Sequence, residues 1–84
     1  MAHRRFFWDF FGPHAEPTAA HFVRHLDEFL ARNALTGCST GTLSAGPGHH
    51  AAYCDAPADV GAAIERALRP RRSEPAPENA DPSD

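Results

Sequence analysis

The chain has 84 residues, of which 42% are hydrophobic, and its formal charge is −3. This length can hold one domain with a small core. It leaves no room for a second domain. The apolar run near the N-terminus is six residues long and contains an acid, so it is too short for a membrane span or a secretory signal. We therefore expect a cytoplasmic protein, in which Cys38 and Cys54 are reduced and behave as small buried hydrophobic residues.

The first predicted element is a strand over residues 4–11, which Gly12 and Pro13 end. Side chains alternate between the two faces of a strand. One face therefore carries Phe6, Trp8 and Phe10, which we assign to the core. The opposite face carries Arg5, Phe7, Asp9 and Phe11. Two aromatic side chains are thus expected on the outside of the sheet.

A helix is predicted from Pro17 to about Asn33, because proline in the first helical turn loses no needed N–H. Its apolar residues recur at spacings of three and four and form one stripe: Ala19, Phe22, Val23, Leu26, Phe29 and Leu30. This pattern predicts a helix that packs one face on the sheet.

A hairpin follows, with a modest strand over residues 36–44 and a second strand over residues 49–54. The segment Ala45–Gly48 turns the chain, but the loop has two, three or four residues, so the register is open. A three-residue loop would place Cys38 opposite Cys54. A shift by one residue would separate them.

A second helix is predicted after Asp55 or Ala56, with Pro57 in its first turn and Pro70 beyond its end. The last dozen residues, 73–84, contain three prolines and four acids and no large apolar side chain, so we predict a disordered acidic tail. Subtracting the tail's −4 from the total of −3 leaves +1 for the predicted domain, residues 1–72.

The predicted order is therefore βαββα, an α+β sandwich with both helices on one face of a three-stranded antiparallel sheet of order 1-3-2. Over residues 4–70 this resembles the first five elements of the ferredoxin-like βαββαβ sandwich, without its last strand. The resemblance is one of topology and brings no family motif. It implies that one edge of the first strand is unpaired, which invites a homodimer.

Histidine is the unusual residue, with six in the chain. His21 and His25 are four residues apart on the first helix and Glu28 follows one turn later, a spacing that can chelate Zn, Ni or Cu. The motif is not that of metalloproteases, because position 22 is Phe. Partly solvated flank residues are the alternative interpretation. Metal ligands must be deprotonated, so binding here should weaken below about pH 6.

A second group of histidines is predicted at one rim of the sandwich, where the hairpin tip and the start of the first helix should meet. Its members are His14, His49 and His50, with Glu16 and Ser44 nearby. They are candidates for a metal site, or for acid–base work on a small anionic substrate. Loop histidines that face water are the alternative.

Three functions follow from these patterns. The first is a non-catalytic binding or accessory module that forms a homodimer through the first strand, by its free edge or by its outer face, with Arg5, Phe7, Asp9 and Phe11 at the interface. The second is binding of a transition metal, Zn or Ni, by the histidines. The third is a small enzyme that uses the histidine rim. No catalytic motif supports an enzyme, and the near-neutral domain argues against nucleic acid as a partner.

Overall fold

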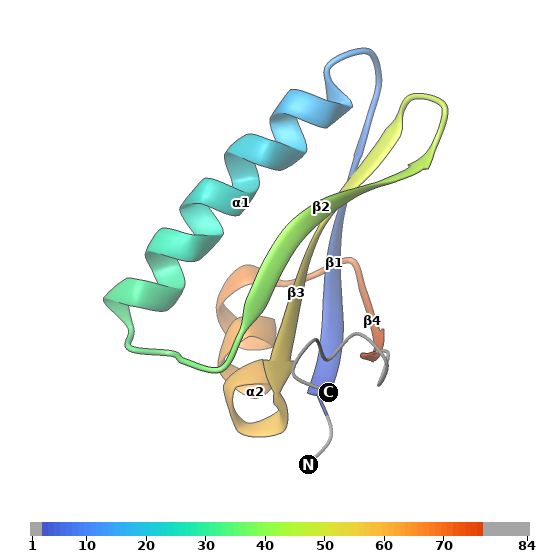
Figure 1. Cartoon of the computed structure of the whole chain (residues 1–84). Coiled ribbons are helices and arrows are strands. Elements are labelled where there is room, and N and C mark those ends of the chain that lie inside the picture. The colour runs from blue at the N-terminus through green and yellow to red at the C-terminus, as the bar shows by residue number, and fades with distance from the viewer. Residues whose placement is uncertain (1–2, 77–84) are drawn as a thin grey trace, which may run out of the picture.

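The computed structural model of the chain describes residues 3–76. It consists of β1 (His3–Phe11), α1 (Ala15–Arg32), β2 (Ser39–Gly46), β3 (His49–Pro57), α2 (Ala58–Leu68) and β4 (Arg72–Pro75) (Figure 1). The strands form one antiparallel sheet of order β2-β3-β1-β4. The fold is therefore α+β with the element order βαββαβ.

The sheet has four strands, and the prediction of three was wrong. The fourth strand, β4, pairs antiparallel with β1, from Arg4 opposite Pro75 to Phe7 opposite Arg72. It uses residues 73–75, which the composition had placed in the acidic tail, while residues 77–84 lie outside the described part. A strand of four residues that contains one proline and two charged side chains has no apolar pattern that could reveal it. Only pairing with the long β1 makes it a strand.

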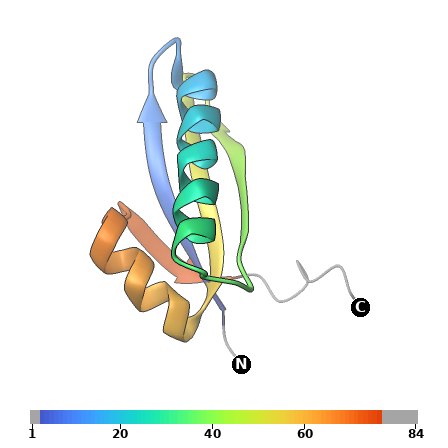
Figure 2. The same ribbon diagram turned by 90° about the vertical axis from the view of Figure 1, so that its left-hand side faces the viewer.

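Both helices lie on one face of the sheet, as predicted (Figure 2). The core between the layers contains Phe6 and Trp8 of β1, which belong to the predicted inner face, and Leu26 of α1 and Ile64 of α2, all buried. The Trp8 indole N–H donates to the Leu68 carbonyl at the end of α2, at 3.1 Å. Alternation along β1 thus fixes which side the helices cover.

Helix α1 begins two residues earlier than predicted, after His14, so that Pro17 lies within the first turn rather than at its start. Either position suits proline, because the first four N–H groups of a helix have no intrahelical acceptor. Strand β3 continues to Pro57, so Asp55 is a strand residue and not a helix cap. Helix α2 then ends at Leu68, just before Pro70, with Arg69 in the left-handed region at φ 49°.

The hairpin register differs from the three-residue alternative. Ser44 pairs with His50 and Gly46 with His49, with a bulge between them, and Thr40 lies opposite Cys54. Cys38 is therefore two residues beyond that pair, before β2 begins. The bulge adds a residue on one strand, which a sequence pattern of period two cannot reveal.

No helix among the described residues is both long and apolar enough to cross a membrane.

Candidate functional site

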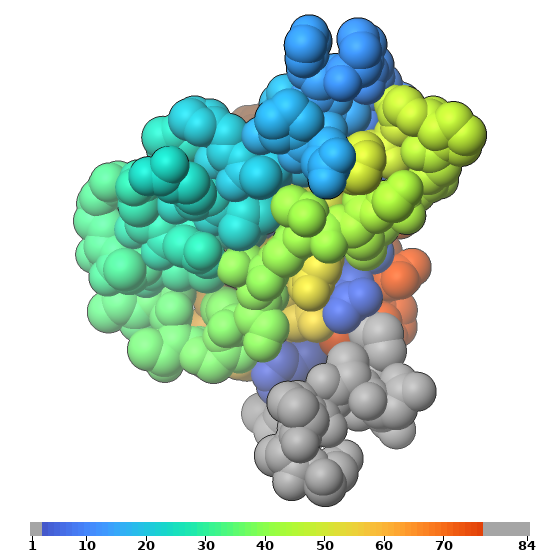
Figure 3. All heavy atoms as spheres, turned by 45° about the horizontal axis from the view of Figure 1, so that its top comes forward, coloured from blue at the N-terminus to red at the C-terminus, as the bar shows by residue number. Residues whose placement is uncertain are grey.

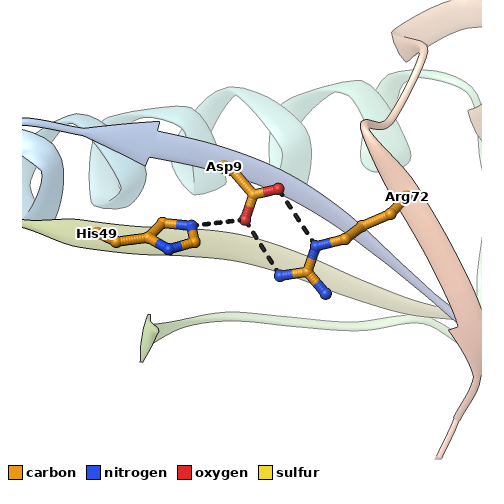
Figure 4. Close-up of polar contacts among 3 residues, drawn as sticks. All are labelled: Asp9, His49 and Arg72. Carbon is orange, nitrogen blue, oxygen red and sulfur yellow. Dashed lines mark hydrogen bonds and ion pairs between the residues drawn. The ribbon is translucent and has the colours of Figure 1, made fainter. Parts of the chain in front are cut away.

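The sheet face opposite the helices, here called the outer face, carries the main polar cluster of the molecule. The register places Asp9 of β1 opposite Ala51 of β3. His49 precedes Ala51 by two residues and so lies on the same face of the sheet, and Arg72 is the first residue of β4. The Asp9 carboxylate lies between these two side chains (Figure 4). Three separate strands thus converge on one carboxylate.

The Asp9 carboxylate accepts hydrogen bonds from both neighbours. The Arg72 guanidinium donates to its two oxygens at 3.1 and 3.2 Å, and His49 Nε2 lies 2.9 Å from Oδ1. The Asp9 side chain is only 9% exposed. Hydrogen bonding to Arg72 is the main cause that lowers the pKa of Asp9, His49 adds to it, and burial opposes it. The carboxylate therefore stays charged and fixed at neutral pH.

Arg72 also covers Phe7, which corrects the prediction that Phe7 is exposed. The Arg72 guanidinium carbon lies 4.0 Å from the centre of the Phe7 ring, and Phe7 is only 5% exposed. A cation over an aromatic face is attractive in itself, and the arginine stem adds apolar cover. Phe7 is therefore not available in one chain for stacking on a base or for a sheet-face dimer.

A second ion pair lies on the outer face toward the start of β1. Arg5 donates two hydrogen bonds to Asp55, at 2.6 and 2.8 Å, and these raise the pKa of Arg5. The Arg5 guanidinium also lies 4.5 Å from the centre of the Tyr53 ring. That ring rests on Gly41, where an added Cβ would come within 2.9 Å of three Tyr53 atoms. Glycine is needed here for the close approach of the ring to the strand.

Phe11 is the exposed member of the predicted interface. It is 68% exposed and is the large hydrophobic side chain most open to solvent among residues 3–76. One side of its ring stacks on His49, with centroids 4.3 Å apart and planes tilted by 24°. Phe11 is the last residue of β1, next to the loop that leads to α1. Of the four predicted interface residues, only Phe11 thus offers a large apolar surface.

The edge of β1 is open beside Phe11. The His3 and Phe7 carbonyls accept hydrogen bonds from Ala76 and Arg71 on the β4 side, so the backbone groups of odd-numbered residues point to that edge. Pairing with β4 ends at Phe7. Within residues 3–76 no strand continues along the backbone groups of Asp9 and Phe11, which we call the open edge.

The predicted rim exists, but its histidines diverge. The β1–α1 connection and the β2–β3 hairpin tip lie side by side, joined by a hydrogen bond from Gly12 N–H to the Gly48 carbonyl at 2.8 Å (Figure 3). His49 and His50 are consecutive in β3, so their side chains lie on opposite faces of the sheet. His14 is exposed at the start of α1, without a side-chain capping bond. The described residues contain no group of three potential metal ligands, so His14, His49 and His50 form no common site.

The predicted set on α1 is also incomplete as a three-ligand site. His21 and His25 do face each other, with their Nε2 atoms 3.0 Å apart. Glu28 lies 3.6 Å from His25 on the other ring nitrogen, Nδ1. It therefore stands behind His25 and not beside the two facing nitrogens. The spacing predicted the histidine pair but not which nitrogen faces the carboxylate.

The His49–Asp9 pair resembles half of a nucleophile-activating arrangement, in which a carboxylate orients a histidine. The remaining part would be a hydroxyl or thiol bonded to the histidine. In the portion of the chain that the structure describes, His49 makes no such contact; its partners are Asp9 and the Phe11 ring. A hollow of about 140 Å³ lies elsewhere, near the start of β1, lined by Arg4, Phe6, Ala58, Gly61, Ala62 and Glu65.

Neither cysteine forms a disulfide, and the prediction that both are buried holds for Cys54 but not for Cys38, which is partly exposed. Cys54 is fully buried in the core, and burial raises its pKa to about 12, with a further contribution from Cys38. Burial also raises the pKa of Cys38, which is partly exposed. Neither thiol has the lowered pKa of a reactive cysteine.

Two residues of the outer face were missed by sequence reasoning. Arg72 is the last residue before the predicted tail, and Asp55 was one of two candidate helix caps, with Ala56 as the other. No local pattern indicates that either pairs with β1. Comparison with known proteins finds no matching family model, no matching curated protein and no matching solved structure.

Proposed function

We propose that this chain is a small, non-catalytic binding module that self-associates as a homodimer through the open edge of β1. The single observation that carries this proposal is Phe11, which is 68% exposed at the end of a strand whose edge β4 leaves uncovered. An unpaired edge beside an apolar side chain favours addition of another strand.

The occupant that fits best is a second copy of the same strand. Two open edges related by a twofold axis would run antiparallel, with Asp9 of each copy opposite Phe11 of the other. In that register both pairs are of the hydrogen-bonded type, which gives about four backbone hydrogen bonds. Phe11 would then contact the partner's strand instead of water. The same surface serves both copies, as a twofold interface requires.

The other edges of the sheet are less suited to this role. The edge of β4 is four residues long and carries Arg72, Glu74 and Pro75, which are features that discourage strand addition. The edge of β2 is rich in Ser, Thr and Gly, with Leu43 as its only large apolar residue. These differences direct association to β1. The small size of the open edge indicates a weak interface, populated at high micromolar concentration.

The test uses two separate proline variants, one at the open edge of β1 and one at the edge of β2, and each removes one backbone N–H. Phe11→Pro deletes a donor at the open edge, whereas Thr42→Pro deletes a donor that points away from β3 at the β2 edge. Light scattering coupled to size-exclusion chromatography would measure the mass at high micromolar concentration. We expect a dimer for the parent chain and Thr42→Pro, and a monomer for Phe11→Pro.

A side-chain variant separates edge pairing from loss of fold. Phe11→Glu retains the N–H but places a charge opposite Asp9 of the partner, so it should also give a monomer, with an unchanged circular dichroism spectrum. A parent chain that stays monomeric at the highest concentration would overturn the proposal. Dimerisation by Phe11→Glu as strong as that of the parent would overturn the proposed surface.

A further inference from the structure

We propose that His21 and His25 together chelate one late transition-metal ion, Cu(II) or Ni(II), on the exposed face of α1. The two Nε2 atoms lie 3.0 Å apart, and the ring centroids are separated by 4.6 Å with the planes at 71°. This site is distant from the sheet's outer face, because α1 covers the opposite side. It is therefore independent of the proposed dimer.

The separation of the two nitrogens indicates which metals suit the pair. Metal–imidazole bonds are about 2.0–2.1 Å long. Two nitrogens 3.0 Å apart that bind one ion then subtend an angle of about 94° at the metal. This is close to the right angle between neighbouring ligands of a square-planar or tetragonal centre, which Cu(II) and Ni(II) prefer. Tetrahedral Zn(II) prefers a wider angle. The separation of the nitrogens thus suits Cu(II) or Ni(II), and each ring turns so that its lone pair points at the ion.

Glu28 contacts the ligand His25 on the ring nitrogen that does not bind the metal. Its Oε1 lies 3.6 Å from His25 Nδ1, the nitrogen that does not face His21. A carboxylate at that position favours the tautomer with the proton on Nδ1, which leaves the lone pair of Nε2 for a metal. Glu28 is thus a positioning residue, and the sequence-based assignment of Glu28 as a ligand is revised.

Metal binding requires a change of tautomer in one ring only. Without metal, one Nε2–H donates to the other Nε2. The ion takes the place of that proton, which moves through solvent to Nδ1 of the same ring, so both neutral imidazoles then present lone pairs. Arg24 shares this helix face and its positive charge opposes binding, whereas Glu28 favours it. Water or a ligand from solution fills the remaining metal positions.

The site is built on rigid structure. The same helix buries Leu26 and Leu30 against the sheet and so fixes the helix orientation. His21 and His25 are exposed, so their replacement removes no core packing. Variants at these positions are therefore expected to fold, which makes the site directly testable.

The experiment uses untagged full-length protein carrying His3→Ala, because a histidine near a chain terminus can bind Cu(II) by itself. Calorimetric titration with CuCl₂ and NiCl₂ at pH 7.5 should give saturable binding of one ion per chain. His21→Ala and His25→Ala should each lower the affinity tenfold or more. The matched control, His14→Ala, removes an exposed histidine just before the start of α1 and should bind as the parent does.

Two further measurements test the geometry. The electron paramagnetic resonance spectrum of the Cu(II) form should show coupling to two equatorial nitrogens, and Glu28→Gln should weaken binding several-fold while retaining that spectrum. Equal binding by His21→Ala and the parent would overturn the proposal, as would a spectrum with one nitrogen. Tighter binding of Zn(II) than of Cu(II) would overturn the assignment of the metal.

Discussion

The two halves of β1 have the same kind of sequence but different surroundings. In the first half, Phe7 lies under Arg72, and β4 pairs with the strand edge. In the second half, Phe11 is exposed and the edge is open. An aromatic residue on the outer face is therefore buried or exposed according to whether a short distant segment reaches it. The strand pattern alone does not decide this.

The largest expected effect contrasts two phenylalanines of this strand. Phe6→Ala removes a ring that is 2% exposed and packs against Gly61 of α2, so it should cost about 3–5 kcal/mol of the free energy of unfolding. Phe11→Ala should change that free energy by less than about 0.5 kcal/mol for the monomer. Urea denaturation at low protein concentration measures both. Similar losses for both variants would contradict the burial of Phe6 in the core and the exposure of Phe11.

The next largest effect concerns the Asp9 carboxylate, which lies in the second half of β1 and contacts Arg72 of β4. Asp9→Asn removes the charge that Arg72 and His49 contact, and should cost about 1.5–3 kcal/mol at pH 7. The pKa of Asp9 is lower in the folded state than in the unfolded state. The stabilisation by its carboxylate is therefore complete above the unfolded pKa, near 3.9, and is lost as the pH falls through the folded pKa.

The difference between the parent and Asp9→Asn should therefore shrink as the pH is lowered through this range. Urea midpoints measured at pH 7 and at progressively lower pH check it, with Asp59→Asn on the exposed first turn of α2 as the control. A constant difference across the whole range would mean that the carboxylate charge does not stabilise the fold.

A smaller effect is expected where Tyr53 rests on β2. Gly41→Ala places a methyl group within van der Waals overlap of the ring, and should cost about 1 kcal/mol or somewhat more because the half-buried ring can move. In Gly41→Ala/Tyr53→Ala the clash is absent, so the two losses should not add. Additive losses in thermal unfolding would show that the ring does not lie on Gly41 in solution.

The smallest effect is chemical and leaves stability unchanged. A thiol reagent added to the folded protein should modify Cys38, which is partly exposed, and leave Cys54 unmodified, since Cys54 is buried and its pKa is raised to about 12. Both should react in denaturant. Mass spectrometry after brief labelling identifies the modified residue. Rapid labelling of Cys54 under native conditions would contradict its place in the core.

The pattern of the sequence was sufficient for the helices and for the inner face of β1. The apolar stripe of α1 and the alternation along β1 turn the same residues toward the core in any sandwich that covers one sheet face, with Phe6 and Trp8 buried and Phe10 partly buried. The pairing of His21 with His25 followed for the same reason, since residues four apart on a helix are always neighbours. These features depend on local geometry, which the sequence specifies.

The tertiary structure alone decided the fourth strand and the outer face. Residues 72–75 have no strand pattern of their own and become extended by pairing with β1, and that pairing brings Arg72 over Phe7 and Asp9. Which of His49 and His50 lies on the outer face also required the final register of β3. Contacts between segments distant in the chain depend on register and closure, and a period of two or of 3.6 residues carries no information about either.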